Sequence, residues 1–135
     1  MWQGRYVSWN PIAIEKSSKW GNLFVEAIHD DWEGFRIWLR PENRNQGLVI
    51  VRFEAVLMYV NSDESDRLSV VEVEKNRVLN QGFWRVENSA LVKEFKRQGA
   101  GISDEDNITH YVFITYSDCI DVLSMLEPEI INMVV

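Results

Sequence analysis

Residues that build covalent and metal-based sites are scarce in this sequence. It contains one cysteine, Cys119, and two histidines, His29 and His110. One cysteine excludes an internal disulfide and a metal site made of several cysteines. The two histidines form no HxH or HxxxH pair for a metal ion. The sequence therefore predicts neither a metal centre nor a bound cofactor, and its single cysteine is compatible with a reducing compartment.

Long apolar segments are also missing. No apolar run reaches the roughly 20 residues that a helix needs to cross a bilayer. The N-terminal stretch, MWQGRYVSWNPIAI, has neither the basic start nor the apolar core of roughly 7–15 residues that a signal peptide requires. We therefore expect a cytoplasmic protein with no membrane association.

Positive charge is in the minority. The chain has 14 Lys and Arg against 21 Asp and Glu, which gives a net charge of −7. Phosphate binding needs clustered Lys and Arg, so this balance argues against nucleic acid as a ligand. An acidic surface raises the encounter rate with a basic partner, although the same charge also serves solubility alone.

Apolar residues, by contrast, are plentiful enough for a core. With 135 residues, 46% of them hydrophobic, the chain predicts one globular domain over residues 1–135. Its longest apolar run is Gly47–Asn61. Alternate residues are apolar in both phases of this run, and only Arg52 and Glu54 interrupt the second phase. This pattern predicts a strand covered on both faces. Fully extended, the run would measure about 45 Å, so we predict a bulge or bend near Arg52–Glu54.

Turn residues divide the first half of the chain into further strands. Asp30-Asp31 and Glu33-Gly34 mark the turn of a hairpin between Leu23–His29 and Phe35–Arg40. Asp66–Lys75 fits either a helix or a short strand, and we favour the helix.

The second half contains the clearest helix. Ala90–Gln98 is amphipathic, and Asn88 or Ser89 is its predicted N-cap. Strands are predicted around it at Phe83–Val86, Ile108–Tyr116 and Ile120–Leu126, with a helix as the alternative for the last. The whole pattern predicts a single α+β domain: a mainly antiparallel sheet of five to seven strands, with one or two helices packed on one face.

The sequence predicts no catalytic pair of nucleophile and base and no metal site around its histidines. A two-residue turn at Ser117-Asp118 would put Cys119 and His110 on one sheet face, about 20 Å apart, which excludes a nucleophile–base pair. The helical alternative for the last segment would break this register and reopen the question. We interpret Cys119 as a buried small apolar residue. His29 beside Asp30-Asp31 is better explained by a turn than by a metal site, because neighbouring strand residues point to opposite faces.

We interpret two acidic clusters and one polar helix start as structural features. The clusters Asp63–Asp66 and Asp104–Asp106 resemble calcium loops only in charge, since neither has the spacing of such a loop. The amides after Glu87-Asn88-Ser89 could bind an anion, but capping of the helix is the commoner outcome.

Six tryptophans could line a cleft or form a binding surface. Trp38 is the first choice, because the alternation places it on the face of Arg36 and Arg40, opposite the apolar phase. An exposed tryptophan between two arginines is typical of an interface hot spot, whereas a second layer covering this face would bury it. Trp38, Arg36 and Arg40 are therefore the predicted binding residues, and no residue is predicted to be catalytic.

The later half of the chain also resembles a known group. From Phe83 it reads FWRVENSALVKEFKRQGAG, followed by ITHYVFITYSDCIDVLSMLEPEI. This phrasing, together with DESDRL at residues 63–68, resembles small uncharacterised bacterial proteins over residues 62–130. The resemblance implies a bacterial, cytoplasmic, one-domain protein, and it transfers no catalytic residue.

Three functions remain, in order of preference. The first is a non-enzymatic interaction protein that binds another protein through an aromatic and acidic surface. The more specific form of this hypothesis is that the partner protein is basic. Immunity proteins that block a toxin are comparable in size and charge, though not in motif. The second is a small-molecule binding domain with a pocket between sheet and helix, lined by Trp and Tyr. The third is an enzyme that uses His110 with a nearby carboxylate such as Asp121.

Overall fold

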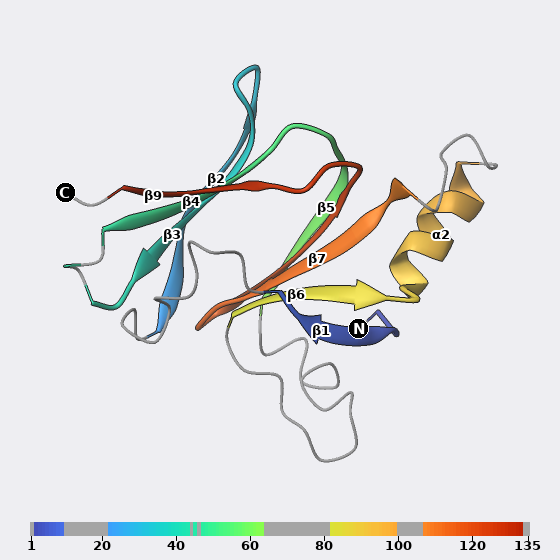
Figure 1. Ribbon diagram of the computed structural model, residues 1–135, viewed down its shortest axis with the longest axis horizontal. Coiled ribbons are helices and arrows are strands. Elements are labelled where there is room, and N and C mark those ends of the chain that lie inside the picture. The colour runs from blue at the N-terminus through green and yellow to red at the C-terminus, as the bar shows by residue number, and fades with distance from the viewer. Residues whose placement is uncertain are drawn as a thin grey trace, which may run out of the picture.

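Two antiparallel sheets make up the computed structural model, which describes residues 2–9, 22–43, 45, 47–63, 82–99 and 107–133 (Figure 1). In spatial order, the first sheet contains β1 (Arg5–Ser8), β6 (Gly82–Glu87), β7 (Thr109–Ile114), β8 (Asp118–Ser124) and β5 (Val56–Asp63). The second sheet contains β2 (Leu23–Asp31), β3 (Gly34–Pro41), β4 (Leu48–Phe53) and β9 (Glu129–Met133). The described helix is α2 (Ala90–Gln98).

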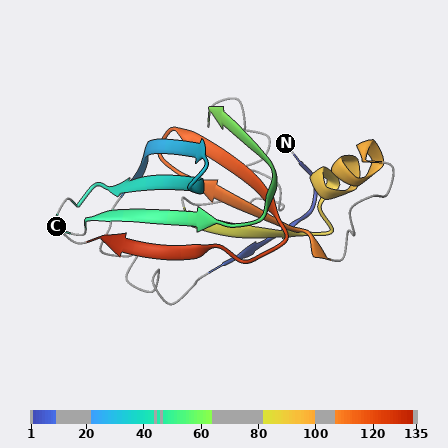
Figure 2. The same ribbon diagram turned by 90° about the horizontal axis from the view of Figure 1, so that it is seen from above.

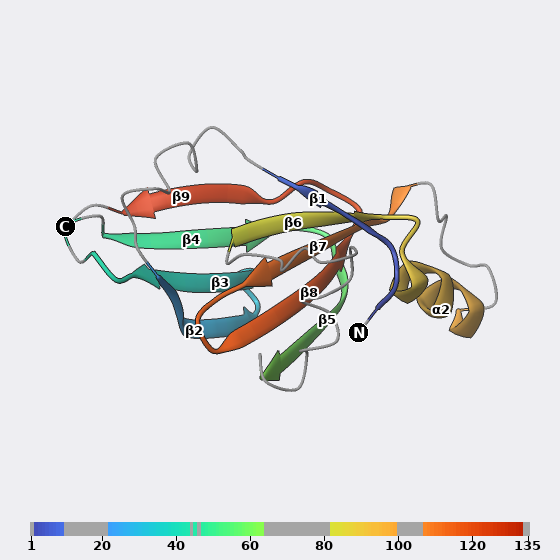
Figure 3. The ribbon, with the colours of Figure 1, turned by 90° about the horizontal axis from the view of Figure 1, so that it is seen from below.

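The α+β class and the antiparallel pairing are confirmed, but the prediction of one sheet with five to seven strands is wrong. The described strands number nine, and they form two layers. In Figure 3 the first sheet crosses in front of the second. The main core lies between the layers, where alternate residues of β3 and β4 meet those of β7 and β8. Its buried members are Trp9, Leu23, Phe35, Ile37, Leu39, Val49, Val51, Phe53, Phe83, Tyr111, Phe113, Ile120 and Val122.

The bend in the long apolar run explains the second sheet. β4 ends at Phe53 in the second sheet, and β5 begins at Val56 in the first, which confirms a bend next to Arg52–Glu54. The chain makes the same change of sheet between β8 and β9. β8 pairs with β5 in the first sheet, where Met58 lies opposite Leu123, and β9 pairs with β4 in the second, where Arg52 lies opposite Glu129. Figure 2 shows this bent pair of strands passing between the sheets.

The prediction that both faces of the apolar run are covered is correct only for the part that forms β4. In β4, Val49 and Val51 point into the core and Ile50 is also buried on the opposite face. β5 is an edge strand whose residues are half-buried or exposed. A single apolar pattern therefore serves a central strand at one end and an edge strand at the other.

The remaining element predictions hold with one change of register. The hairpin of β2 and β3, strand β6 and helix α2 lie where the sequence predicts them. Residues 118–124 form strand β8, so the helical alternative is wrong. Thr115 and Asp118 close a four-residue turn, with the Thr115 N–H donating to the Asp118 carbonyl at 2.9 Å. Ile114, and not Tyr116, therefore pairs with Cys119. The prediction for Asp66–Lys75 lies outside the described residues.

Helix α2 sits at one end of the first sheet, on the face turned away from the second sheet (Figure 1). Its apolar stripe places Leu91 and Val92 against Ile108 and Leu123. Lys96 and Arg97 occupy its last turn, where cations suit the negative end of the helix dipole. A second cluster on the same sheet face buries Cys119 with Val112 and Ile114, which confirms Cys119 as a buried apolar residue.

Candidate functional site

The tip of the β2–β3 hairpin exposes an aromatic side chain. Asp31 pairs with Gly34, so Trp32 and Glu33 are the two turn residues. Gly34 has a φ of 105°, a conformation that glycine adopts readily and other residues rarely do. Trp32 is 93% exposed, while the other described tryptophans are buried or half-buried. The tip extends beyond both sheets at the top of Figure 1.

An ion pair braces this tip from below. The Arg36 guanidinium donates to both carboxylate oxygens of Asp31, at 2.9 and 3.1 Å, and to the Gly34 carbonyl at 3.2 Å. The Glu33 N–H donates to the same Asp31 carboxylate at 2.9 Å. These bonds join the two sides of the turn, so the backbone that carries Trp32 is held in one geometry. The side chains of Asp30, Asp31 and Glu33 remain exposed around it.

Protonation of Asp31 should loosen this brace. The hydrogen bond from Arg36 lowers the pKa of Asp31 below its ordinary value of 3.8. Because the folded state lowers this pKa, the stabilisation is fully present at neutral pH and is lost as the pH falls below 3.8. In an Arg36→Gln variant, NMR titration of the Asp31 carboxyl should move to higher pH. An unchanged midpoint would show that Arg36 does not hold this carboxylate in solution.

The predicted binding residues lie on the outer face of the second sheet. Trp38, Arg36 and Arg40 share this face, as the alternation requires, and the face is turned toward the viewer in Figure 2. Trp38 is half-buried, its ring centroid lies 5.1 Å from that of His29, and its Nε1 has no acceptor among the described residues.

Both arginines already have partners within the chain. Arg36 binds Asp31, and Arg40 donates to Glu26 at 3.1 Å while its guanidinium lies 4.8 Å from the centre of the Phe24 ring. The structure therefore brings the three predicted residues onto one face but makes Trp32 the more exposed aromatic. His29 packs on Trp38, and Asp31 stabilises the turn, as expected for turn chemistry.

A second candidate site is buried beneath the start of α2. Ser89 is the N-cap: its Oγ accepts the Val92 N–H at 3.2 Å. The same Oγ lies 2.7 Å from His110 Nδ1, and His110 Nε2 lies 2.7 Å from Asp121 Oδ1. These three side chains are 5%, 0% and 1% exposed. They form a continuous hydrogen-bonded chain, which we call the Ser89–His110–Asp121 chain.

One assignment of protons satisfies every link in this chain. With a neutral imidazole, the Ser89 hydroxyl accepts the Val92 N–H and donates its own proton to His110 Nδ1. A neutral imidazole then donates its Nε2–H to the Asp121 carboxylate. The carboxylate thus fixes the tautomer in which Nδ1 is a proton acceptor facing a hydroxyl.

Three separate elements bring the chain together. His110 on β7 lies between Val86 of β6 and Leu123 of β8, and Asp121 is the diagonal neighbour on the same face. After β6, Asn88 adopts a φ of 53°, a left-handed conformation that asparagine tolerates better than most residues. This turns the backbone into α2 and places Ser89 over the imidazole.

The sequence pointed to parts of this site separately. His110 with Asp121 belonged to the enzyme hypothesis, and Ser89 was predicted only as a cap. Their contact was missed, because 21 residues separate Ser89 from His110 and no local pattern predicts which strand residue lies under a helix cap.

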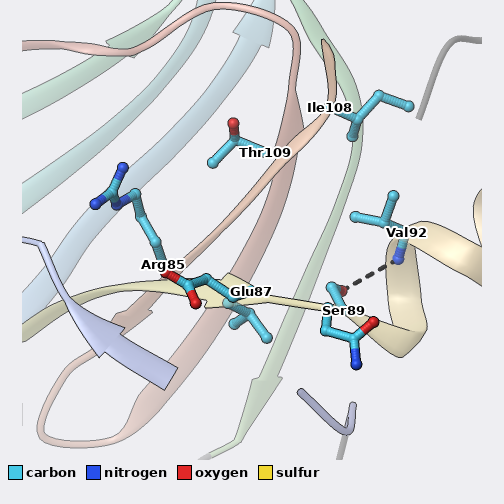
Figure 4. Close-up of a pocket in the computed structure, with 8 residues that line it drawn as sticks. Arg85, Glu87, Ser89, Val92, Ile108 and Thr109 are labelled. Atoms are coloured by element: carbon cyan, nitrogen blue, oxygen red, sulfur yellow. Dashed lines mark hydrogen bonds between the residues drawn. The ribbon is translucent and has the colours of Figure 1, made fainter. Parts of the chain in front are cut away.

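A pocket of about 350 Å³ opens beside Ser89 (Figure 4). Its walls are residues 85–87 of β6, residues 88 and 89 of the turn, Val92 of α2, and residues 108 and 109 at the start of β7. It thus lies between sheet and helix, where the small-molecule hypothesis places one. Tryptophan and tyrosine do not contribute to the walls of this pocket.

Within the described ranges, no group of three or more His, Cys, Asp or Glu is placed to hold a metal ion. The same part of the chain has no helix with the length and hydrophobicity of a membrane span. Of the two acidic clusters in the sequence, only Asp63 lies in a described range.

Comparisons of the chain with protein-family models, curated proteins and solved structures give no significant match. The resemblance over residues 62–130 therefore stays a prediction. The hairpin tip and the Ser89–His110–Asp121 chain are the two features of the described residues that bear on function.

Proposed function

We propose that this protein binds another protein through the tip of the β2–β3 hairpin, with Trp32 as the anchor. The observation that carries the proposal is the 93% exposure of Trp32 on a braced turn. Tryptophan is among the residues most enriched in interface hot spots. A solvent-exposed indole contributes no burial free energy to folding. Its burial in a partner's apolar pocket would therefore favour association.

The brace reduces the cost of binding. A flexible loop would lose conformational freedom when it enters a partner. Here the Asp31–Arg36 pair and the Glu33 N–H already hold the turn. The exposed backbone at the tip therefore needs little further ordering, and most of the burial energy of Trp32 remains for affinity.

Charge around the tip indicates the partner's chemistry. Asp30, Asp31 and Glu33 surround Trp32, and Arg36 beneath them is engaged with Asp31. The tip thus adds to the net charge of −7. A complementary surface is an apolar pocket rimmed by Lys or Arg, which agrees with a basic partner and predicts salt-dependent association.

Affinity capture from the lysate of the source organism tests this proposal, with salt varied in the wash. Wild type should retain one stoichiometric partner that is lost as salt rises. Trp32→Ala should weaken the purified complex by roughly 100-fold, as expected for a hot-spot tryptophan, without lowering stability. The matched control is Tyr116→Ala, which removes another exposed aromatic from the β7–β8 turn. A Trp32→Ala variant that binds as tightly as wild type would sink the proposal.

The same measurement separates Trp32 from the outer sheet face. If Trp38→Ala weakens the complex and Trp32→Ala does not, the interface is the face of Trp38, Arg36 and Arg40. Variant Trp38→Ala needs a parallel unfolding curve, because its ring packs on His29 and its loss affects the sheet.

Small-molecule binding is a second candidate, favoured by the pocket between β6 and α2. Its volume falls at the lower end of the range of roughly 300–1,000 Å³ for ligand pockets. A ligand that binds only the folded state raises the melting temperature. A metabolite screen by thermal shift therefore tests this candidate, and the absence of any stabilising compound would count against it.

A further inference from the structure

The Ser89–His110–Asp121 chain has the parts of an activated nucleophile. A hydroxyl lies 2.7 Å from a ring nitrogen, and the other ring nitrogen lies 2.7 Å from a carboxylate. Nucleophile, base and orienting carboxylate at these distances are the geometric signature of nucleophilic catalysis by serine. Either ring nitrogen can act as base, provided that the carboxylate holds the proton on the other one.

The start of α2 supplies electrostatic support for negative charge on Ser89. The Oγ already accepts the Val92 N–H, and a helix N-terminus carries partial positive charge. The first turn of α2 contains no acidic residue to neutralise it. Charge that develops on Oγ or on a bound carbonyl oxygen at this point is therefore favoured.

A pocket lies beside Ser89. Ser89 forms part of the wall, and Val92 and Ile108 provide apolar surface next to it (Figure 4). Arg85 and Thr109 lie across the pocket, where they offer polar contacts. A volume of about 350 Å³ accommodates a short acyl group with a polar end.

We propose that Ser89 and His110 are catalytic residues for acyl transfer from small carboxylic esters, with Asp121 as a positioning residue. Ser89 Oγ attacks the ester carbonyl carbon while its proton passes to His110 Nδ1. The tetrahedral adduct then breaks the bond to the alkoxy group, which leaves as an alcohol with the proton from Nδ1. Water attacks the acyl-serine, again with His110 as base, and releases the carboxylic acid and free Ser89. The net reaction is hydrolysis of one ester bond, with no other reactant.

The test is covalent labelling of the full chain with a small dialkyl fluorophosphate, followed by intact-mass measurement and peptide mapping. Wild type should gain one adduct, on Ser89, and Ser89→Ala should gain none. The control Ser117→Ala, which changes an exposed serine in the β7–β8 turn, should label like wild type. Folded wild type without an adduct, or an adduct on any other residue, overturns the proposal.

A structural role alone must be distinguished from a chemical one. Asp121→Asn keeps the shape of the side chain, and its amide can still bond to His110. It should remain folded, with a melting temperature near that of wild type. Its labelling rate should nevertheless fall at least 100-fold, because an amide does not stabilise the imidazolium as a carboxylate does. Equal labelling rates in folded Asp121→Asn and wild type would contradict the role assigned to Asp121. This inference is independent of the hairpin tip.

Discussion

Replacing Asp121 with alanine should lower the free energy of unfolding by about 3 kcal/mol, the cost expected when a buried polar network loses one partner. The His110 ring is fully buried, and its Nε2–H donates to Asp121 at 2.7 Å. Without the carboxylate this buried donor loses its acceptor. Ser89 then loses its correctly oriented partner, so the N-terminus of α2 is weakened as well.

Urea unfolding followed by circular dichroism measures this effect. The matched control is Asp30→Ala, which removes an exposed carboxylate from β2 and should change the free energy by less than about 0.5 kcal/mol. If the two variants unfold at the same urea concentration, the buried chain does not stabilise the fold. Comparison with Asp121→Asn then separates loss of the hydrogen bond from loss of the charge.

Truncation of Phe113 to alanine should be still more damaging, at about 3–5 kcal/mol. Its ring is fully buried between the sheets, with centroids 5.0 Å from Phe83, 6.0 Å from Phe53 and 6.4 Å from Trp9. These three neighbours come from β6, β4 and the segment after β1, so they belong to different elements. They cannot all collapse into the cavity, and the contacts across the core are lost.

The control for Phe113 is Tyr116→Ala. Tyr116 lies three residues further along the chain, is 56% exposed, and contacts Phe24 at 5.3 Å between centroids. We expect a loss below about 1 kcal/mol there. Urea curves with unchanged slopes would show that both variants unfold in the same two-state manner. A loss below 1 kcal/mol for Phe113→Ala would contradict the position of the core.

Local patterns in the sequence predicted most elements. Alternation and turn residues placed the β2–β3 hairpin, and the length of Gly47–Asn61 required the bend after Phe53. Apolar spacing with a serine cap placed α2 at Ala90–Gln98. Each of these features depends on residues a few positions apart, whose backbone preferences act within the segment itself.

Predictions that depended on pairing between strands were less secure. The β7–β8 turn was predicted with two residues, but Thr115 caps a four-residue turn through hydrogen bonds from its backbone and hydroxyl. The shift by two positions preserved the face of His110 and changed its partner from Met125 to Leu123. Side-chain alternation does not detect such a shift, because its period is also two.

Short-range backbone and burial preferences thus predict the α+β class, the hairpin, the bend and the helix with its cap. Only the tertiary structure decided that the bent run belongs to two sheets, and that Trp32 is exposed while Trp38 packs on His29. It alone brought Ser89, His110 and Asp121 into contact. The physical reason is that these outcomes depend on which distant segments pack together, and that choice follows from the summed burial of the whole chain.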